Sequence, residues 1–211
     1  MDSSSRRAVL RAVAVAVAAA LGRSGAIAGE AALARQRRHK PTKPRPRCGA
    51  GGPCRVFVSS TVYGGKIGGL AGADFLCQDL AESAGLPGAY QAWLSDSTAS
   101  PSTRFVRSKG PYVLVNGQRI ADTWQDLTDG SLDIPITVTQ TGSKVAESTS
   151  VWTYTNAAGA ALDANTHTCG NWAAATGDGA VGSDTSRNAT WTDNGAAACN
   201  TGQHLYCFQQ S

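Results

Sequence analysis

Residues that could perform catalysis are few in this sequence, and their spacing does not bring them together. His167 and His204 are the only histidines after residue 47. No Gly-x-Ser-x-Gly or His-x-x-x-His motif sets a nucleophile beside a base or pairs metal ligands. We therefore expect His204 to be a half-exposed strand residue and His167 to be a polar loop residue. No catalytic residue is predicted.

The carboxylates do not indicate a hydrolytic site either. Residues 48–211 hold Glu82, Glu147 and eleven Asp. Most of the Asp residues stand beside Gly, Thr or Asn, which is typical of turns. Glycoside hydrolysis needs two acidic residues that face each other across a cleft, and no pair is indicated here. We expect a protein that is not an enzyme; an exported polysaccharide-acting enzyme is the alternative.

The tryptophans are the other side chains that could contact a ligand. Trp93 and Trp152 lie in predicted strands and are expected in the core. Trp172 and Trp191 flank a loop-rich region, where an aromatic ring could stack on a sugar. With Asp193 and Asn194 they form the candidate ligand-binding set. Packing of the two rings beneath the loops is the alternative, and it is favoured.

Six cysteines, all after residue 47, indicate a disulfide framework. A metal site is disfavoured because no Cys-x2-Cys pair occurs. Six cysteines allow about fifteen pairings, so counting alone does not choose one.

The elements that would position these residues begin with a strand at 55–61 and a glycine-rich turn at 64–69. A helix is predicted over 70–84, where Ala73, Leu76, Cys77, Leu80 and Ala84 share one face. Gly85 and Pro87 end it.

Shorter elements follow this helix. Strands are expected at 89–95, 151–155 and 205–210, and Asn116-Gly117 predicts a hairpin within 112–120. A second, short helix is expected at 123–127 with Asp122 as its cap. Residues 157–200 are rich in Gly, Ala, Asn, Asp and Thr, so we expect long loops tied down by Cys169 and Cys199.

These elements predict an α+β domain with two helices and mixed or antiparallel sheets. The last strand needs a partner, and the strand at 55–61 is the natural one. That pairing would let Cys207 reach Cys77 on the helix. Cys169 and Cys199 would then staple the loop region, and Cys48 and Cys54 would form a small ring, although the sequence leaves that last pairing open.

Two sequence blocks resemble the endostatin domain of collagens. They are Gly64 to Cys77 (GGKIGGLAGADFLC) and Ala84 to Ser95 (AGLPGAYQAWLS). Later pieces follow in matching order: Ser150-Val151-Trp152, Cys169-Gly170-Asn171-Trp172, Cys199 and Leu205-Tyr206-Cys207-Phe208. The match is closer still to a bacterial family of endostatin-like secreted and surface proteins, largely a domain of unknown function. It covers about residues 55–211 and is weak over 100–150.

The resemblance implies a C-type-lectin-like fold with Cys77–Cys207 and Cys169–Cys199 disulfides. C-type lectins bind sugar through calcium, and Trp191-Thr192-Asp193-Asn194 loosely resembles their late-strand motif. Their partner motif of Glu or Gln before Pro-Asn or Pro-Asp is absent, which argues against calcium. We expect no cofactor and no metal. The zinc-binding histidines and heparin-binding arginines of the mammalian domain are not matched here.

Residues 1–28 have the features of a signal peptide. Arg6, Arg7 and Arg11 precede the apolar run 12–21, and Ala26-Ile27-Ala28 is a small-x-small cleavage site. The run is too short to span a bilayer as a stable helix, although an uncleaved anchor is the alternative. The twin-arginine and general secretory routes are both open. We expect a secreted, periplasmic or cell-surface protein.

Residues 29–47 predict a basic, Pro-rich, disordered tether to the domain at 48–211. The net charge of +4 divides into +3 for 1–28, +6 for 29–47 and −5 for 48–211. An acidic domain argues against nucleic-acid binding. Residues 35–47 are either a solvated spacer or a handle for an anionic cell-surface polymer.

These observations together predict a non-catalytic exported binding module. The resemblance adds that some relatives are thought to bind host matrix and plasma proteins. We expect residues 157–200 to recognise an extracellular protein or glycan. A structural envelope protein, docked by its cationic tether, is a further alternative.

Overall fold

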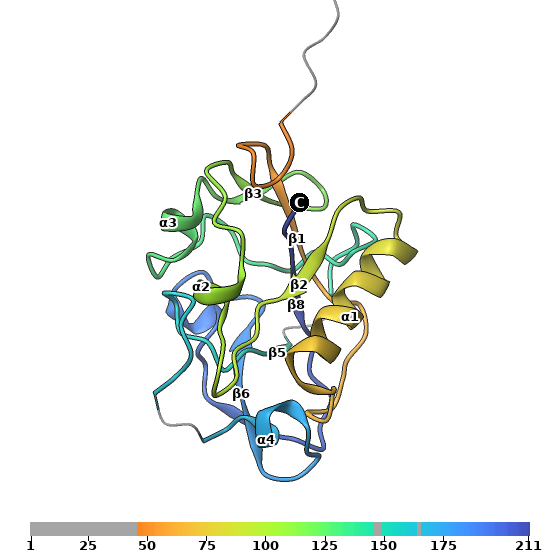
Figure 1. The fold of residues 1–211 in the computed structure, drawn as a ribbon, viewed down its shortest axis with the longest axis vertical. Coiled ribbons are helices and arrows are strands. Elements are labelled where there is room, and N and C mark those ends of the chain that lie inside the picture. Colours follow the sequence, from red (N-terminus) through yellow and green to blue (C-terminus); the bar gives the residue numbers. More distant parts are fainter. Residues whose placement is uncertain (1–45, 146–148, 164–165) are drawn as a thin grey trace, which may run out of the picture. The chain divides into compact units, whose positions relative to one another are not determined.

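A five-stranded mixed sheet joins the first and last strands of the domain (Figure 1). The computed structural model describes residues 46–145, 149–163 and 166–211. The strand order is β2-β8-β1-β3-β4, with β1 antiparallel to β8 and parallel to β3. The predicted pairing of the first and last strands is therefore confirmed. The five strands are β1 (Cys54–Val58), β2 (Tyr90–Ala92), β3 (Tyr112–Leu114), β4 (Arg119–Ala121) and β8 (Tyr206–Gln209).

Alternation along β1 and β8 divides the interior into two cores, because successive strand side chains point to opposite faces. Val56 and Phe208 face a core that includes Trp93, Trp124 and Trp191. Phe57 and Cys207 face the core beneath α1. Both faces of the sheet are covered, so β1 and β8 are buried along almost their whole length.

The helix α1 (Gly69–Ser83) covers one face of this sheet with small side chains. Ala73, Cys77 and Ala81 are buried, while Leu76 and Leu80 are only half-buried. The predicted face was therefore wrong by a small rotation, because the close approach to the sheet admits alanine better than leucine. Gly68, just before the helix, has a φ of 86°, a conformation that favours glycine.

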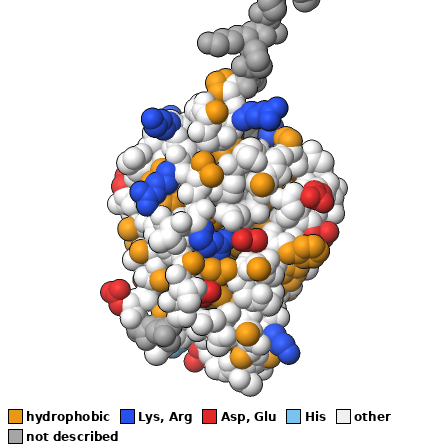
Figure 2. All heavy atoms as spheres, viewed as in Figure 1, with side chains coloured by type: hydrophobic (Ala, Val, Ile, Leu, Met, Phe, Trp, Pro, Cys, Tyr) orange, Lys and Arg blue, Asp and Glu red, His pale blue; other side chains and the backbone are white. Residues whose placement is uncertain are grey.

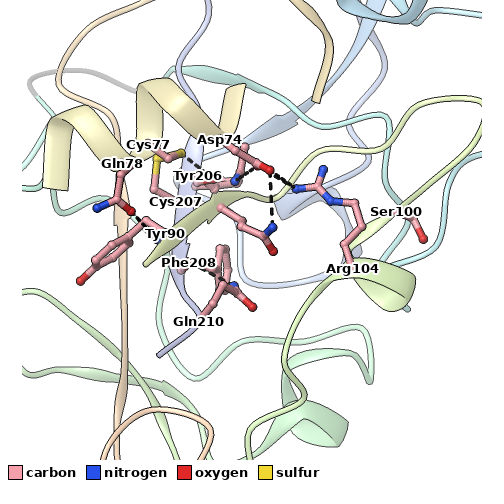
Figure 3. A network of polar contacts seen from close by, with 12 residues as sticks. Asp74, Cys77, Gln78, Tyr90, Ser100, Arg104, Tyr206, Cys207, Phe208 and Gln210 are labelled. Atoms are coloured by element: carbon pink, nitrogen blue, oxygen red, sulfur yellow. Dashed lines mark hydrogen bonds and ion pairs between the residues drawn. A yellow bond between two sulfur atoms is a disulfide. The ribbon is translucent and has the colours of Figure 1, made fainter. Parts of the chain in front are cut away.

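Two α1 side chains also cover the open edge of β2 (Figure 3). Asp74 Oδ1 accepts a hydrogen bond from Ala92 N at 2.9 Å, and Gln78 Oε1 accepts one from Tyr90 N at 2.8 Å. Arg104 Nη2 donates to Asp74 Oδ1 at 2.7 Å. Burial nevertheless raises the pKa of Asp74, because desolvation outweighs these contacts. The helix thus satisfies strand amide groups that would otherwise lie unpaired at a sheet edge.

The predicted hairpin is present as β3 and β4, which pair antiparallel on either side of Asn116-Gly117. The short helix α3 (Trp124–Leu127) follows, but the prediction of Asp122 as its cap was wrong. Thr123 Oγ1 accepts from Asp126 N instead. Asp122 is occupied by an ion pair with Arg119.

A second, three-stranded sheet lies within residues 150–198. β5 (Ser150–Trp152), β6 (Asp178–Ser183) and β7 (Ala196–Ala198) pair antiparallel in that order. The prediction of loops throughout 157–200 was therefore wrong in part. The prediction of two helices was also incomplete, since the described residues hold four helical segments: α1, α2 (Pro101–Arg104), α3 and α4 (Cys169–Trp172), of which α4 has a left-handed backbone. A 3-10 turn, η1 (Ala189–Trp191), is present besides.

Three disulfides pair all the described cysteines: Cys48–Cys54, Cys77–Cys207 and Cys169–Cys199. All three expected pairings are confirmed, including the small ring that the sequence left open. Several disulfides in one small domain indicate an extracellular or otherwise oxidising compartment.

The predicted signal peptide and almost all of the predicted tether lie outside the described residues. Of the tether, only Pro46 and Arg47 are described, and both are exposed. Within the described ranges, no helix is long and apolar enough to cross a membrane.

Candidate functional site

The two tryptophans proposed as ligand contacts are buried in the structure. Trp172 and Trp191 are each 0% exposed. Trp172 packs on Trp152 and donates its Nε1 hydrogen to Ser95 O at 2.7 Å. Trp191 packs between Trp93 and Tyr206. Neither ring is accessible to a ligand. Both tryptophans pack beneath the loops, which is the alternative that the sequence favoured.

Asp193 and Asn194 are exposed, in the turn between η1 and β7. Their backbone amides donate to Ala189 O and Val181 O, so the turn is anchored. Among the described residues, no group of three or more His, Cys, Asp or Glu is placed to hold a metal ion. The structure therefore brings these two residues together but separates them from the two buried tryptophan rings.

Trp172 is held inward by an unusual backbone. The four residues of α4 have φ values of 49°, 59°, 55° and 62°, so the segment is a left-handed turn. Such a turn costs about 1–2 kcal/mol per non-glycine residue. The Cys169–Cys199 disulfide and two hydrogen bonds from Ile67 N and Gly68 N to Trp172 O hold it in place. The region 157–200 therefore contains a rigid framework that supports the fold.

Hollows on the described surface lie elsewhere. The largest of three has a volume of about 680 Å³ and is shallow. We call it the hydroxyl groove, because most of its lining side chains carry hydroxyl groups. No described residue of the range 157–200 lines any of the three. The hydroxyl groove is lined by Ser60, Thr61, Val62, Thr139, Thr141, Ser143, Lys144, Val145, Thr149 and His204.

Its rim is anchored to the central sheet. Val58 N donates to Val138 O at 3.0 Å, and Gln140 Oε1 accepts from Ser60 N at 3.1 Å. Gln140 Nε2 also donates to Ser60 Oγ at 2.6 Å. The segment after β1 and the segment at 138–145 are thus joined side by side, and their next residues form the two walls of the groove.

His204 lines the groove and is only 6% exposed, so the prediction of a half-exposed residue was wrong. Its Nδ1 lies 2.5 Å from Ser59 O. A carbonyl oxygen only accepts, so Nδ1 must carry the hydrogen. In the neutral ring, Nε2 is then an acceptor. The backbone at His204 is also fixed, because its N–H donates to Ser150 O and its carbonyl accepts from Trp152 N.

Asp184 lies behind the groove and is 1% exposed. Its carboxylate accepts from Thr149 N at 2.8 Å. Burial raises the pKa of Asp184, although the Thr149 amide and the His204 ring each counteract part of that rise. Thr149 Oγ1 is also buried; it has no hydrogen-bond partner within bonding geometry among the described residues, but it lies near enough to the Asp184 carboxylate to lower that pKa. Polar groups that are costly to bury therefore gather at this groove.

The two other hollows differ in their chemistry. One, of about 460 Å³, is lined by Val62, Lys66, Gly72, Phe75 and neighbouring residues; we call it the Phe75 hollow. The other, of about 540 Å³, includes Arg47 and Arg55 and is called the arginine hollow. On the face in Figure 2, most Lys and Arg side chains lie towards the end where the described chain begins.

Among the residues that the structure describes, no Asp or Glu side chain lines any of the three hollows. Ser59, the serine nearest His204, donates its hydroxyl to Thr61 O and accepts from Leu205 N. It is thus engaged in holding the backbone. The hydroxyl groove offers hydrogen-bond donors and acceptors and one ammonium group, which suits recognition of an oxygen-rich ligand.

No protein-family model matches this sequence, and no curated protein is similar enough to it to count as a match. The groove residues could not be identified from the sequence, because the hydroxyl side chains come from three separate segments and His204 from a fourth. Only the run Thr137-Val138-Thr139-Gln140-Thr141 carries a visible signal, an alternation of threonines that places Thr139 and Thr141 on the same side.

Proposed function

We propose that this protein is a non-catalytic exported binding module that holds a glycan in the hydroxyl groove. The observation that carries the proposal is the lining: among the described residues it offers six hydroxyl side chains, one lysine and one buried imidazole, and no Asp or Glu side chain. Sugars present many hydroxyl groups, each of which can donate and accept, and these side chains match both roles. A shallow groove suits a chain of sugars that lies across the surface. An extracellular protein is the alternative ligand.

Features of the fold support membership of the endostatin-like family with its C-type-lectin-like fold. The first and last strands pair antiparallel, a disulfide joins α1 to β8, and a second sheet follows. The proposal differs from the sequence-based expectation in where the ligand lies. It places the ligand between residues 60–62 on one side and residues 139–145 and Thr149 on the other, outside 157–200.

A glycan array with the purified full chain tests this function. Binding to at least one glycan is expected. The variant Thr61→Val, Thr141→Val, Lys144→Ala removes two exposed hydroxyls and the ammonium group, and it should weaken binding about tenfold or more. A matched control, Thr176→Val with Lys109→Ala, changes exposed residues outside the groove and should bind normally.

Three results would contradict the proposal. The first is an array without any bound glycan. The second is equal binding by the groove variant and the control. The third is groove-dependent binding to an extracellular protein panel but not to glycans, which would select the alternative ligand.

The described residues that line the three hollows include no Asp or Glu, which also supports a non-catalytic role. Glycoside hydrolysis uses two acidic groups about 5–10 Å apart across the bound sugar. A polysaccharide-acting enzyme would have to place its acids outside these hollows. Release of reducing sugar from a glycan that the groove binds would overturn the non-catalytic part of the proposal.

A second candidate function, docking on an anionic envelope polymer, is favoured by the arginine hollow. Arg47 ends the cationic run 35–47, and Arg55 lines the same hollow. Neither arginine has an ion-pair partner among the described residues. Arg47→Ser with Arg55→Ser should then reduce retention on cells, and deletion of 35–47 should release the protein. Unchanged retention of both variants would remove this candidate.

A further inference from the structure

The outward face of α1 is apolar at its centre and carries opposite charges at its two ends. Ala71, Phe75, Asp79 and Glu82 are exposed along it at helical spacing. Phe75 is 69% exposed, more than Val62 at 49% or Val106 at 46%. Exposed aromatic side chains of this kind are enriched where proteins associate.

The charges lie in a fixed order along the helix. Lys66 stands just before α1, Phe75 is near the middle, and Asp79 and Glu82 follow towards the end. Lys66 has no ion-pair partner among the described residues. The Asp79 carboxylate lies near enough to Tyr63 to help burial raise the pKa of that phenol. The sequence of charges along the face is therefore positive, apolar, negative.

The exposure of Phe75 is built into the fold. Its neighbours Asp74, Cys77 and Gln78 all bind inward, to Arg104, Cys207 and Tyr90 respectively (Figure 3). A helix held on three inward residues cannot rotate about its axis to bury the residue between them. The disulfide makes this arrangement covalent.

Phe75 also borders a recess. The Phe75 hollow lies beside it, with Val62, Ile67 and Leu76 as apolar walls and Lys66 at the edge. The backbone of the loop that lines the Phe75 hollow is fixed by two hydrogen bonds. Tyr63 N donates to Gln203 O and Gln203 N donates to Tyr63 O, each within 2.9 Å. An aromatic ring from another molecule could enter here without reorganising the loop.

We propose that this face binds the same face of a second copy of the chain, with the two α1 helices antiparallel around a twofold axis. In a twofold interface, each residue i that meets residue j is matched by j meeting i. The antiparallel arrangement places Lys66 of each copy against Asp79 and Glu82 of the other. It also brings each Phe75 towards the Phe75 hollow of the partner.

A parallel arrangement would set like charges against each other and is therefore excluded. The self-complementary charge pattern is what selects a second copy as the occupant. A partner with a surface of uniform charge would be repelled by the charges at one end of this face. The dimer does not depend on which ligand the hydroxyl groove binds. It has a consequence for the hydroxyl groove, since Val62 lines both hollows and the dimer would carry two grooves beside its axis.

Sedimentation of the purified full chain over a concentration series tests the proposal. A monomer–dimer equilibrium is expected. Phe75→Ser should weaken association by about tenfold or more, and so should Lys66→Glu. Asp79→Lys with Glu82→Lys should weaken it as well. Combining Lys66→Glu with these two reversals should restore association, because the charges are exchanged and still complementary.

The controls are Val106→Ser and Lys109→Glu, which change an exposed apolar residue and an exposed lysine that has no ion-pair partner among the described residues. Both lie outside α1. Both should associate like the parent. A monomer at every concentration, a dimer insensitive to Phe75→Ser, or a charge exchange that fails to restore association would each overturn the proposal. Glycan binding by a strictly monomeric protein would overturn only this inference and leave the proposed function intact.

Discussion

Gly65 gives the sharpest test of how the Cys169–Cys199 disulfide is packed. A Cβ atom built on Gly65 would overlap Cys169 Sγ and lie 2.8 Å from Cys169 Cβ and 3.0 Å from Cys199 Cβ. The backbone cannot easily retreat, because Gly65 N donates to Cys199 O at 2.8 Å. A methyl group at residue 65 must therefore displace the disulfide.

Gly65→Ala should lower the free energy of unfolding by about 2 kcal/mol. Overpacking of this kind costs about 1–3 kcal/mol. Part of this loss is offset, because alanine restricts the unfolded chain and so stabilises the folded state by about 0.4–1 kcal/mol. This gain applies here because the φ of Gly65 is not in the left-handed region. Urea unfolding of the oxidised protein, followed by tryptophan fluorescence, measures the difference.

Gly64→Ala is the matched control. Its Cβ would lie 3.5 Å from Cys199 O, an ordinary contact, so Gly64→Ala should leave the stability unchanged or raise it by up to about 1 kcal/mol. The cost of Gly65→Ala should also fall in a Cys169→Ala, Cys199→Ala background, where the obstructing sulfur is gone. Equal costs for the two glycines, or an undiminished cost without the disulfide, would refute the packing argument.

Three further outcomes are expected from denaturant titrations. Replacing Cys77 and Cys207 by Ala should lower the free energy of unfolding by about 5 kcal/mol, whereas replacing Cys48 and Cys54 should lower it by about 2 kcal/mol. The difference is expected because the two disulfides span 130 and 6 residues, and a longer loop restricts the unfolded chain more. Equal losses would contradict chain entropy as the cause. Trp172→Phe should cost about 1–3 kcal/mol, since Ser95 O loses its buried donor; an unchanged midpoint would count against that bond. Burial raises the pKa of Asp184 above 3.8, its value in the unfolded chain. The Asp184 carboxyl group therefore contributes its full stabilisation below pH 3.8, and this stabilisation is lost as the pH rises through the folded-state pKa. Asp184→Asn removes this fall, so the variant should gain stability relative to the parent as the pH rises above 3.8; a difference that does not change with pH would exclude the explanation.

The sequence indicated the parts of the fold that depend on local signals. Asn116-Gly117 predicted the hairpin, and the apolar spacing predicted α1, because both depend on neighbours in the chain. The terminal strand pair could also be inferred, since a lone strand at 205–210 needed a partner. From that pair, the Cys77–Cys207 bond followed.

Features that depend on distant contacts could not be inferred in this way. β6 was missed because Gly179 and Gly182 made its sequence look like a loop. Their Cβ atoms would meet the Trp152 ring at 2.7 Å and Thr192 Cα at 2.7 Å, so tertiary packing explains both glycines. The burial of His204 depends on Ser59 O, 145 residues earlier in the chain. The hydroxyl groove likewise exists only once four segments have come together.

The Cys77–Cys207 bond has a mechanical consequence. If the molecule is pulled at residues 46 and 211, tension passes directly from α1 to β8 across the sulfur atoms. The 130-residue separation between them cannot be drawn out. The Cys48–Cys54 bond locks the first turn in the same way. Only the stretches 54–77 and 207–211 can extend, by no more than about 90 Å in total. Under load the domain would act as a short, nearly inextensible link, and most of its interior, including the Cys169–Cys199 bond, would carry no force.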